Sequence, residues 1–268
     1  MSAILELDHV AVTLGGREIL HDVDFTIEPG EFVGLIGTNG AGKTTLLRCI
    51  LGLLRPSTGS VRVLGASARH GNRAIGYVPQ KVNVDPDTPL RGRDMVALGL
   101  DGHRWGMPRP SARKRGLVDD ALRAVDALAF ADAPFGRLSG GEQQRLLVAQ
   151  ALLGEPKIVL LDEPLSNLDL RSANEITALV ANVARERGVA VILVAHDMNP
   201  LLPFMNRLVY LANGRSVIGP VRDVVRTDVL SALYGYPVSV LEVDGRVIVV
   251  SGHDHDHAHH EPQALSFV

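Results

Sequence analysis

The stretch GTNGAGKTT (residues 37–45) follows the apolar run EFVGLI and precedes the helical pattern LLRCILGLL. Within it, Gly37, Gly42, Lys43 and Thr44 satisfy the pattern G-x-x-x-x-G-K-[ST], in the strand-to-helix context that the pattern requires. Side-chain-free positions allow successive backbone N–H groups to turn inward around a polyphosphate, at the positive end of the following helix. A glycine-rich turn that binds nothing is the weaker alternative, because the flanking runs fit a phosphate loop.

The chemistry of this loop assigns roles to its side chains. Lys43 adds a full positive charge, and the Thr44 hydroxyl is offered to a magnesium ion. The whole loop is therefore predicted to bind the nucleotide: Gly37, Thr38, Asn39, Gly40, Ala41, Gly42, Lys43, Thr44 and Thr45.

A second motif, which ends in two acidic residues, accompanies the phosphate loop. The run KIVLLDE (residues 157–163) predicts a buried strand with Asp162 at its carboxyl end, where α/β sheets bind ligands. Asp162 can complete the magnesium shell, and Glu163 is placed to orient and deprotonate an attacking water. A solvated loop acid is the alternative for Glu163, but two carboxylates beside a magnesium nucleotide favour hydrolysis over binding alone.

The distribution of apolar runs predicts the fold class. Short β-branched runs such as ILEL, EFVGLIG, VAVILVA and RLVYLA alternate with longer helical patterns, which is typical of an α/β fold with a largely parallel sheet. We expect helices on both faces of that sheet. Strand signals are sparse between about residues 88 and 153, which predicts a helical subdomain.

The C-terminal part reads as a separate small unit. Asn213-Gly214 predicts a hairpin turn near the end of a main domain covering residues 1–220. Residues 221–251 predict a helix and a second hairpin turning at Asp244-Gly245, an α+β extension. Residues 252–268 are polar, without periodicity, and are expected to be disordered.

Composition limits the partners and the compartment. The 268 residues carry a net charge of -3, so no basic field suggests nucleic acid. The single cysteine, Cys49, suits a reducing compartment. The first residues lack a basic-then-apolar leader, and the apolar runs are shorter than the roughly 20 residues of a membrane helix. We therefore expect a chain that is not secreted and that associates with membranes only peripherally.

The run LSGGEQQR (residues 138–145) opens another helical pattern. Ser139, Gly140 and Gly141 form a small-residue helix N-terminus, which is a second anion site with exposed amides. Ser139 is also expected to cap its helix, and a capping role is compatible with a role in the anion site. Two phosphate-binding termini exceed what one nucleotide on one phosphate loop requires.

Together, these motifs resemble the nucleotide-binding subunit of an ATP-binding cassette (ABC) transporter. The resemblance covers about the first 220 residues and adds Gln80 in GYVPQ, Asp169 in SNLD and His196 in VAHDMN. It implies a P-loop nucleoside triphosphatase of the ABC cassette type, with a mixed-sheet core and a helical signature subdomain. It also implies a head-to-tail dimer, in which the signature residues of one subunit, Ser139 to Glu142, cap the ATP held by the other.

The resemblance further implies the roles of single residues. Gln80 contacts magnesium or the water and reports the nucleotide state to a membrane permease. His196 bonds the γ-phosphate and steadies Glu163, although a lone histidine at a strand end is usually structural. Asp169 reaches across the dimer interface. The catalytic set is then Glu163, His196, Gln80 and Lys43, with magnesium held by Thr44, Gln80 and Asp162.

One position departs from the family pattern. Leu14 stands where family members usually place an aromatic residue that stacks on adenine. An aliphatic contact loses π-stacking of roughly 1–3 kcal/mol per base, so weak base selectivity is expected.

Two features of the sequence indicate the transported substrate: the similarity of several segments to metal-uptake subunits, and the histidines of the C-terminal tail. Segments after Gln80 and around His196 resemble subunits of bacterial zinc or manganese uptake systems, which also implies an extracytoplasmic metal receptor and a place on the cytoplasmic face of the membrane. The tail interleaves histidines with Asp254 and Asp256, a ligand set that suits zinc, nickel or cobalt: His253, His255, His257, His259 and His260. A solvated tail without a role and a metal buffer unrelated to transport remain alternatives, whereas the broken pattern of histidines is unlike a purification tag.

Other functions remain open at this point. An importer for another substrate, or a non-transport ABC ATPase for DNA repair, translation or cluster assembly, would share the core motifs. Coiled coils, tandem cassettes and basic stripes, which such proteins usually show, are not evident in the sequence. A regulatory GTPase is disfavoured because the base-reading motif N-K-x-D is missing.

Overall fold

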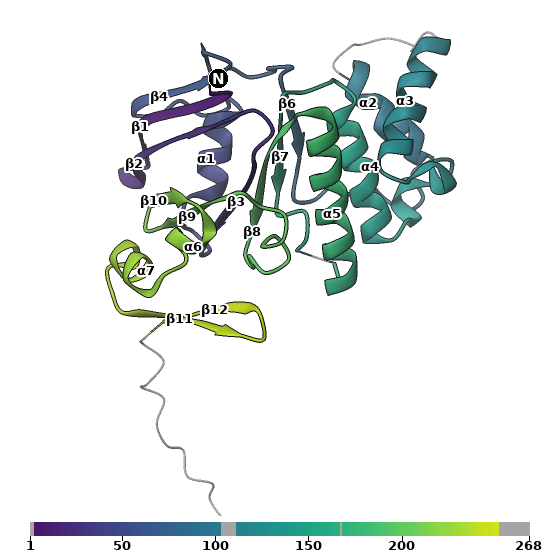
Figure 1. Cartoon of the computed structure of the whole chain (residues 1–268). Helices are drawn as coiled ribbons and strands as arrows, with labels where there is room; N and C mark the ends of the chain where they lie inside the picture. The colour runs from purple at the N-terminus through teal and green to yellow at the C-terminus, as the bar shows by residue number, and fades with distance from the viewer. Residues whose placement is uncertain (1–2, 103–110, 167, 252–268) are drawn as a thin grey trace, which may run out of the picture.

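The computed structural model describes residues 3–102, 111–166 and 168–251 and has a six-stranded sheet at its centre, in the order β10-β9-β3-β8-β7-β6 (Figure 1). Neighbouring strands from β9 to β6 are parallel, and β10 pairs antiparallel to β9. The predicted mixed-sheet core is therefore confirmed. The strands are β3 (Phe32–Gly37), β6 (Ile75–Val78), β7 (Ile158–Asp162), β8 (Ala190–Ala195), β9 (Arg207–Ala212) and β10 (Arg215–Gly219).

The central strands are buried on both sides, which explains their continuous apolar sequences. Alternate residues of β3 enter different cores: Phe32 and Ile36 belong to one, and Val33 and Leu35 to the other. The strands β7 and β8 divide in the same way, as the two-residue period of a strand requires.

One face of the sheet carries a helix, as expected, and also a second sheet that was not expected. It is covered by α1 (Lys43–Ile50) together with a second, antiparallel sheet in the order β2-β1-β4-β5. The helix α1 covers this face as expected, but the second sheet was not predicted. The alternating N-terminal strands bury only one face each, so they form a layer of their own and do not join the central sheet. They are β1 (Leu5–Leu14), β2 (Arg17–Ile27), β4 (Thr58–Val63) and β5 (Ala66–Ser67).

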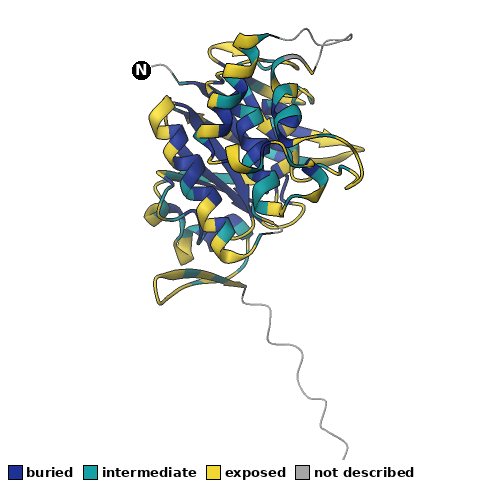
Figure 2. Cartoon of the chain, turned by 90° about the vertical axis from the view of Figure 1, so that its right-hand side faces the viewer, coloured by how far each residue is buried: buried dark blue, intermediate teal, exposed yellow. Residues whose placement is uncertain are grey.

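The other face is covered by helices, as predicted. The helical subdomain contains α2 (Gly92–Asp101), α3 (Ala112–Ala124), two 3-10 turns (Leu128–Phe130 and Phe135–Arg137) and α4 (Gly140–Leu152). It packs with α5 (Leu170–Arg187) against the sheet in the larger core. Figure 2 shows the buried residues in the interior and the exposed residues along the outer faces of the helices.

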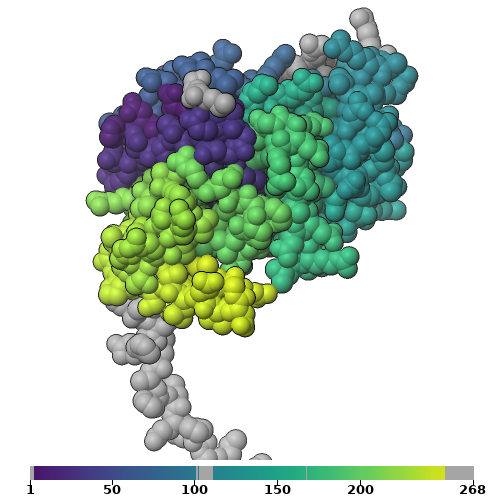
Figure 3. All heavy atoms as spheres, in the orientation of Figure 1, coloured from purple at the N-terminus to yellow at the C-terminus, as the bar shows by residue number. Residues whose placement is uncertain are grey.

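The chain ends in a small lobe, visible along the lower edge of the molecule in Figure 3. It holds α6 (Val221–Val224), α7 (Thr227–Tyr234) and the hairpin of β11 (Val238–Val243) and β12 (Arg246–Ser251). The turn residues Asn213 and Asp244 have φ of 50° and 51°, each followed by a glycine, as predicted for the two hairpins. The domain boundaries stay predictions, and residues 252–268 lie outside the described residues.

Within the part of the chain that the structure describes, no helix combines the length and the apolar character needed to cross a membrane.

Candidate nucleotide site

The phosphate loop links the buried strand β3 to α1 through a backbone that only glycine adopts easily. Gly40 and Gly42 have φ of 77° and 106°, in the left-handed region. A Cβ atom on Gly37 would lie 2.2 Å from the Leu211 carbonyl oxygen, and one on Gly42 would lie 2.6 Å from Leu20 Cδ2. The loop therefore passes close to neighbouring backbone and side chains, and it leads into the first turn of α1, where N–H groups of a helix have no intrahelical partners.

Lys43 is held against the loop itself. Its Nζ donates to the carbonyl oxygens of Gly37 at 2.7 Å and of Thr38 at 3.2 Å, and the residue is only 6% exposed. Burial lowers the pKa of Lys43, while the nearby carboxylates of Glu163 and Asp162 act in the opposite direction. The ammonium group is thus fixed at the edge of the loop, beside both acids.

A cavity of about 430 Å³ lies over the loop. Ten residues line it: Arg17, Ile19, Thr38, Asn39, Gly40, Gly42, Lys43, Thr44, Thr45 and Glu163. Seven of the nine predicted loop residues, all except Gly37 and Ala41, therefore line one cavity together with Glu163, the predicted water-activating acid. Its backbone amides, lysine and hydroxyl groups suit a polyphosphate.

Leu14 does not line this cavity. It sits at the tip of the β1–β2 hairpin, paired with Arg17, and is 41% exposed. Arg17 and Ile19 contribute to the lining instead, and sequence reasoning missed both. Their place on β2, one strand after Leu14, is the signal that could have found them, because a hairpin returns the chain to the same end of the sheet.

Asp162 lies at the carboxyl end of β7 and is 7% exposed. Its Oδ2 accepts a hydrogen bond from the Tyr77 hydroxyl at 3.3 Å. Burial raises the pKa of Asp162, and burial followed by the charge of Asp162 raises the pKa of Tyr77 to about 12. Tyr77, which sequence reasoning also missed, stays protonated and donates to the carboxylate from the neighbouring strand β6.

Glu163 has a constrained backbone, with φ of 49°, and a side chain that is 14% exposed. One carboxylate oxygen accepts from Gln80 Nε2 at 2.6 Å, and the other lies 2.8 Å from His196 Nε2. Three predicted catalytic residues from three separate loops therefore meet at one carboxylate. The arrangement can hold and polarise a water molecule, because the acid is fixed by partners on both sides.

The residues present fit a magnesium ion. The Asp162 carboxylate is a hard oxygen ligand, nearly buried, and the Thr44 hydroxyl lies in the lining of the loop cavity. Gln80 instead contacts Glu163, so a role in the metal shell requires its amide to move.

The signature residues form a separate helix terminus. Ser139 caps α4 by accepting from the Glu142 N–H, and the Glu142 carboxylate accepts from the Ser139 N–H at 2.9 Å and from its hydroxyl at 2.7 Å. Gly140 and Gly141 follow this capping box and have no side chains that would cover the helix terminus. None of these residues lines the loop cavity of the same chain.

Asp169 also caps a helix. Its Oδ1 accepts from the Ser172 N–H at 2.7 Å at the start of α5, and this hydrogen bonding lowers the pKa of Asp169. The residue is exposed, so the carboxylate stays ionised on the surface.

A second cavity, of about 330 Å³, lies between Gln80 and the signature helix. Gln144 contributes to its lining, is 7% exposed, and its Nε2 has no hydrogen-bond partner among the described residues. The sequence analysis gave Gln144 no role, because nothing in the sequence distinguishes it from the adjacent Gln143.

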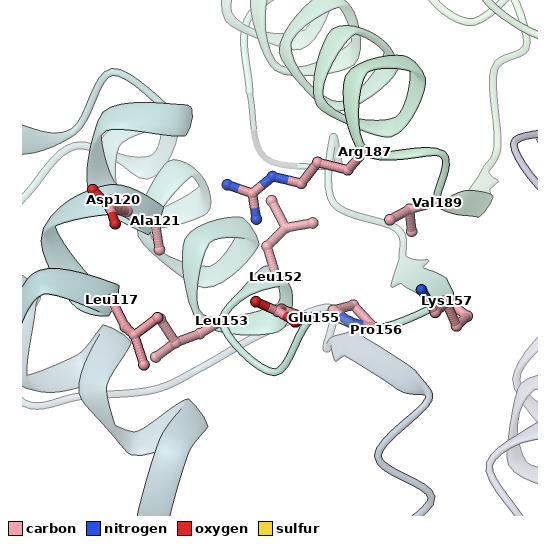
Figure 4. Close-up of a pocket in the computed structure, with 10 residues that line it drawn as sticks. All are labelled: Leu117, Asp120, Ala121, Leu152, Leu153, Glu155, Pro156, Lys157, Arg187 and Val189. Carbon is pink, nitrogen blue, oxygen red and sulfur yellow. The ribbon is translucent and has the colours of Figure 1, made fainter. Parts of the chain in front are cut away.

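A third cavity, of about 390 Å³, lies at the opposite end of β7 from Asp162. Figure 4 shows Arg187 reaching from the end of α5 over Leu152, with Glu155 on the far side. This cavity shares no lining residue with the cavity over the phosphate loop. It lies between α3, the ends of α4 and α5, and the start of β7, so we assign it no part in nucleotide binding.

Comparisons with known proteins show the family of the chain. A family model described as ABC transporter matches residues 20–166. The zinc import ATP-binding protein ZnuC of Pseudomonas fluorescens is 36% identical over 96% of this chain and 90% of its own. The manganese transport system ATP-binding protein MntB of Halalkalibacterium halodurans is 32% identical over 94% of this chain and 100% of its own.

Solved structures show the same fold. A putative metal-chelate type ABC transporter in an inward-facing conformation aligns with a TM-score of 0.77 and 25% identity, covering 93% of this chain and 96% of that one. A dimeric ATP-binding cassette bound to ADP and Pi aligns with a TM-score of 0.68 and 29% identity, covering 81% and 99%. The match of the family model to more than half of the chain, together with these relatives, shows that the protein belongs to the ABC transporter family as one of its ATP-binding subunits.

Proposed function

We propose that this ABC ATPase energises the uptake of a divalent metal ion, zinc or manganese, through a separate membrane permease. The observation that carries the hydrolytic part is the placement of Glu163 between Gln80 and His196, at the rim of the loop cavity. The names of the zinc and manganese relatives support the cargo.

In the proposed reaction, Glu163 takes a proton from the attacking water while Lys43 and the loop amides stabilise charge on the phosphates. His196 holds the Glu163 carboxylate and the γ-phosphate, and Gln80 orients the water. Mg²⁺, held by Thr44, Asp162 and Gln80, would neutralise charge on the phosphate oxygens.

We propose that the site is completed by a second copy. The signature residues Ser139 to Glu142 lie on a helix terminus outside the loop cavity of their own chain, and they have the amides and dipole to bind a phosphate from another subunit. Asp169, exposed at the start of α5, would contact the partner. The dimeric cassette among the solved structures supports this arrangement.

The permease is expected beside the helical subdomain. A groove of about 670 Å³ there is lined by residues of β6 and of α2 to α4, and by Pro79 and Val82 on either side of Gln80. A permease segment in this groove would sense the position of Gln80. The chain would then lie at the cytoplasmic face of the membrane, with an extracytoplasmic metal receptor acting on the permease.

An importer for another substrate, or a non-transport ABC ATPase such as a cluster-assembly factor, is the alternative function. The neighbouring reading frames discriminate, because a polytopic permease and a metal receptor belong only with the importer.

The test uses the chain assembled with its permease in proteoliposomes, with the receptor and zinc or manganese outside. We expect metal uptake that requires ATP, and Glu163→Gln should abolish hydrolysis while the cassettes still pair on magnesium ATP. Glu186→Gln, the same change at an exposed position on α5, serves as the control. ATP hydrolysis without metal uptake would contradict the proposed cargo, and a Glu163→Gln protein that still hydrolyses ATP would contradict the proposed site.

A further inference from the structure

The cavity between Gln80 and the signature helix is bounded by three segments that each lead to the proposed site. The loop after β6 contributes residues 80–83, the start of α4 contributes Gly140, and the loop between Glu163 and α5 contributes Pro164, Ser166 and Leu168. The cavity measures about 330 Å³. A shift of the loop after β6 toward α4 would therefore fill space that is open in this structure.

Gln144 is a wall residue of this cavity whose buried amide has no partner. The residue is 7% exposed, and its Nε2 finds no hydrogen-bond acceptor among the described residues. Its neighbour Gln143 differs, because its Nε2 donates to the carbonyl oxygens of Phe135 at 3.2 Å and Leu138 at 3.0 Å. A buried donor without a partner costs free energy, so a state of the chain that supplies an acceptor to Gln144 is favoured.

The loop after β6 offers acceptors on the same cavity. Residues 81–83 belong to no helix or strand, and their backbone carbonyl oxygens accept no hydrogen bond from the backbone of the described residues. A side-chain bond ties this loop to the site, from Gln80 Nε2 to the Glu163 carboxylate at 2.6 Å. The loop therefore has few bonds to lose when it moves.

The opposite wall of the cavity is already closed. A Cβ atom on Gly140 would lie 3.3 Å from Leu168 Cδ2, so the start of α4 packs closely on the loop before α5. The space that remains is bordered by residues 80–83. Movement of that loop is also what the proposed mechanism requires, because Gln80 must leave Glu163 before its amide can reach the magnesium shell.

We propose that Gln144 is a positioning residue that acts through the Gln80 loop. When two cassettes close on ATP, residues 81–83 move into the cavity and one of their backbone carbonyl oxygens accepts a hydrogen bond from Gln144 Nε2. This bond ties Gln80, at the nucleotide of its own chain, to the signature helix that faces the nucleotide of the partner. The inference rests on the proposed roles of Gln80 and Glu163 and on the proposed pairing of cassettes.

The first experiment compares Gln144→Met with Gln143→Met in urea unfolding of the full chain without nucleotide. Methionine has nearly the shape of glutamine but donates no hydrogen bond. Gln144→Met should not lower the free energy of unfolding, because the donor that it removes has no partner in this state. Gln143→Met should lower it, because two hydrogen bonds are lost. Equal losses would show that the Gln144 amide is already bonded without nucleotide, and would overturn the proposal.

The second experiment measures ATP hydrolysis and pairing of the same Gln144→Met protein. We expect kcat to fall by about three- to tenfold, the equivalent of one net hydrogen bond. The dissociation constant for ATP in the unpaired chain should not change, because Gln144 does not line the loop cavity. In a Glu163→Gln background, pairing on magnesium ATP should weaken by a similar factor, measured by analytical ultracentrifugation. Asn182→Met, at an exposed amide on α5, is the control that should change none of these quantities.

A double-mutant cycle tests whether Gln144 acts through Gln80. The loss of kcat from Gln144→Met should shrink or vanish in a Gln80→Ala background, because the amide that the new bond positions is then missing. Losses of kcat that add fully would overturn this route of action, and a Gln144→Met protein with the kcat and the pairing of the wild type would overturn the proposal as a whole. A wild type that hydrolyses no ATP would instead contradict the proposed function.

Discussion

His196 Nε2 lies 2.8 Å from the carboxylate of Glu163, although the two residues follow different strands of the central sheet. The neighbouring parallel strands β7 and β8 end at the same edge of the sheet, and this places the acid and the histidine side by side. The contact gives the histidine a role that its sequence position alone leaves open.

The first prediction concerns this contact. His196→Ala should lower kcat by about a hundredfold or more, since it removes a group that holds the proposed general base, Glu163. The dissociation constant for ATP should change less, because Lys43 and the loop amides would still bind the phosphates. Single-turnover hydrolysis and nucleotide titration measure the two quantities. His70→Ala, at an exposed histidine before β6, is the control. A kcat within about threefold of the wild type would show that Glu163 needs no support from His196.

The second prediction compares two glycines of the phosphate loop. Gly40 and Gly42 both have positive φ, but a Cβ atom meets nothing within 4 Å at Gly40 and meets Leu20 Cδ2 at 2.6 Å and the Ile19 carbonyl oxygen at 3.2 Å at Gly42. Gly40→Ala should therefore cost about 1 kcal/mol of unfolding free energy from backbone conformation. Gly42→Ala should cost about 1–3 kcal/mol more, because atoms must also shift. Urea unfolding without nucleotide measures both, and equal losses would contradict the steric argument.

The third prediction concerns the base. With Leu14 at the hairpin tip and Arg17 and Ile19 in the cavity lining, the KM values for ATP and GTP should differ by less than about tenfold, because no aromatic ring stacks on the base. Ile19→Tyr, which puts an aromatic ring at a position that lines the cavity, should tighten ATP binding by roughly 1–3 kcal/mol. Leu64→Tyr, at another exposed leucine, is the control. A hundredfold preference of the wild type for ATP would mean that another residue contacts the base.

The fourth prediction concerns Cys49, the one cysteine of the sequence. The residue is buried on α1, and burial raises the pKa of its thiol to about 11. Since the thiolate is the nucleophile, alkylation by iodoacetamide at pH 8 should be slow in the native protein. The rate should increase as the pH approaches 11, and it should increase strongly in denaturant. Rapid alkylation of the native protein at pH 8 would contradict the burial of this helix face.

The sequence by itself determined the local features of this protein. The phosphate loop, the Asp162-Glu163 pair, the Ser139 cap and the glycine turns at Asn213 and Asp244 depend on residues within a few positions of each other. Short-range backbone geometry decides such features, so the pattern of residue types suffices to predict them.

The tertiary structure alone decided how distant segments meet. The sequence did not predict that the N-terminal strands form a separate layer over α1, nor that Tyr77 contacts Asp162 across 85 positions or Gln80 contacts Glu163 across 83. The hydrogen bond from the Val247 N–H to Asn199 Oδ1, across 48 positions, belongs to the same class. Periodicity shows which face of an element is buried, but strand order decides which elements share that face, and strand order is fixed by packing of the whole chain.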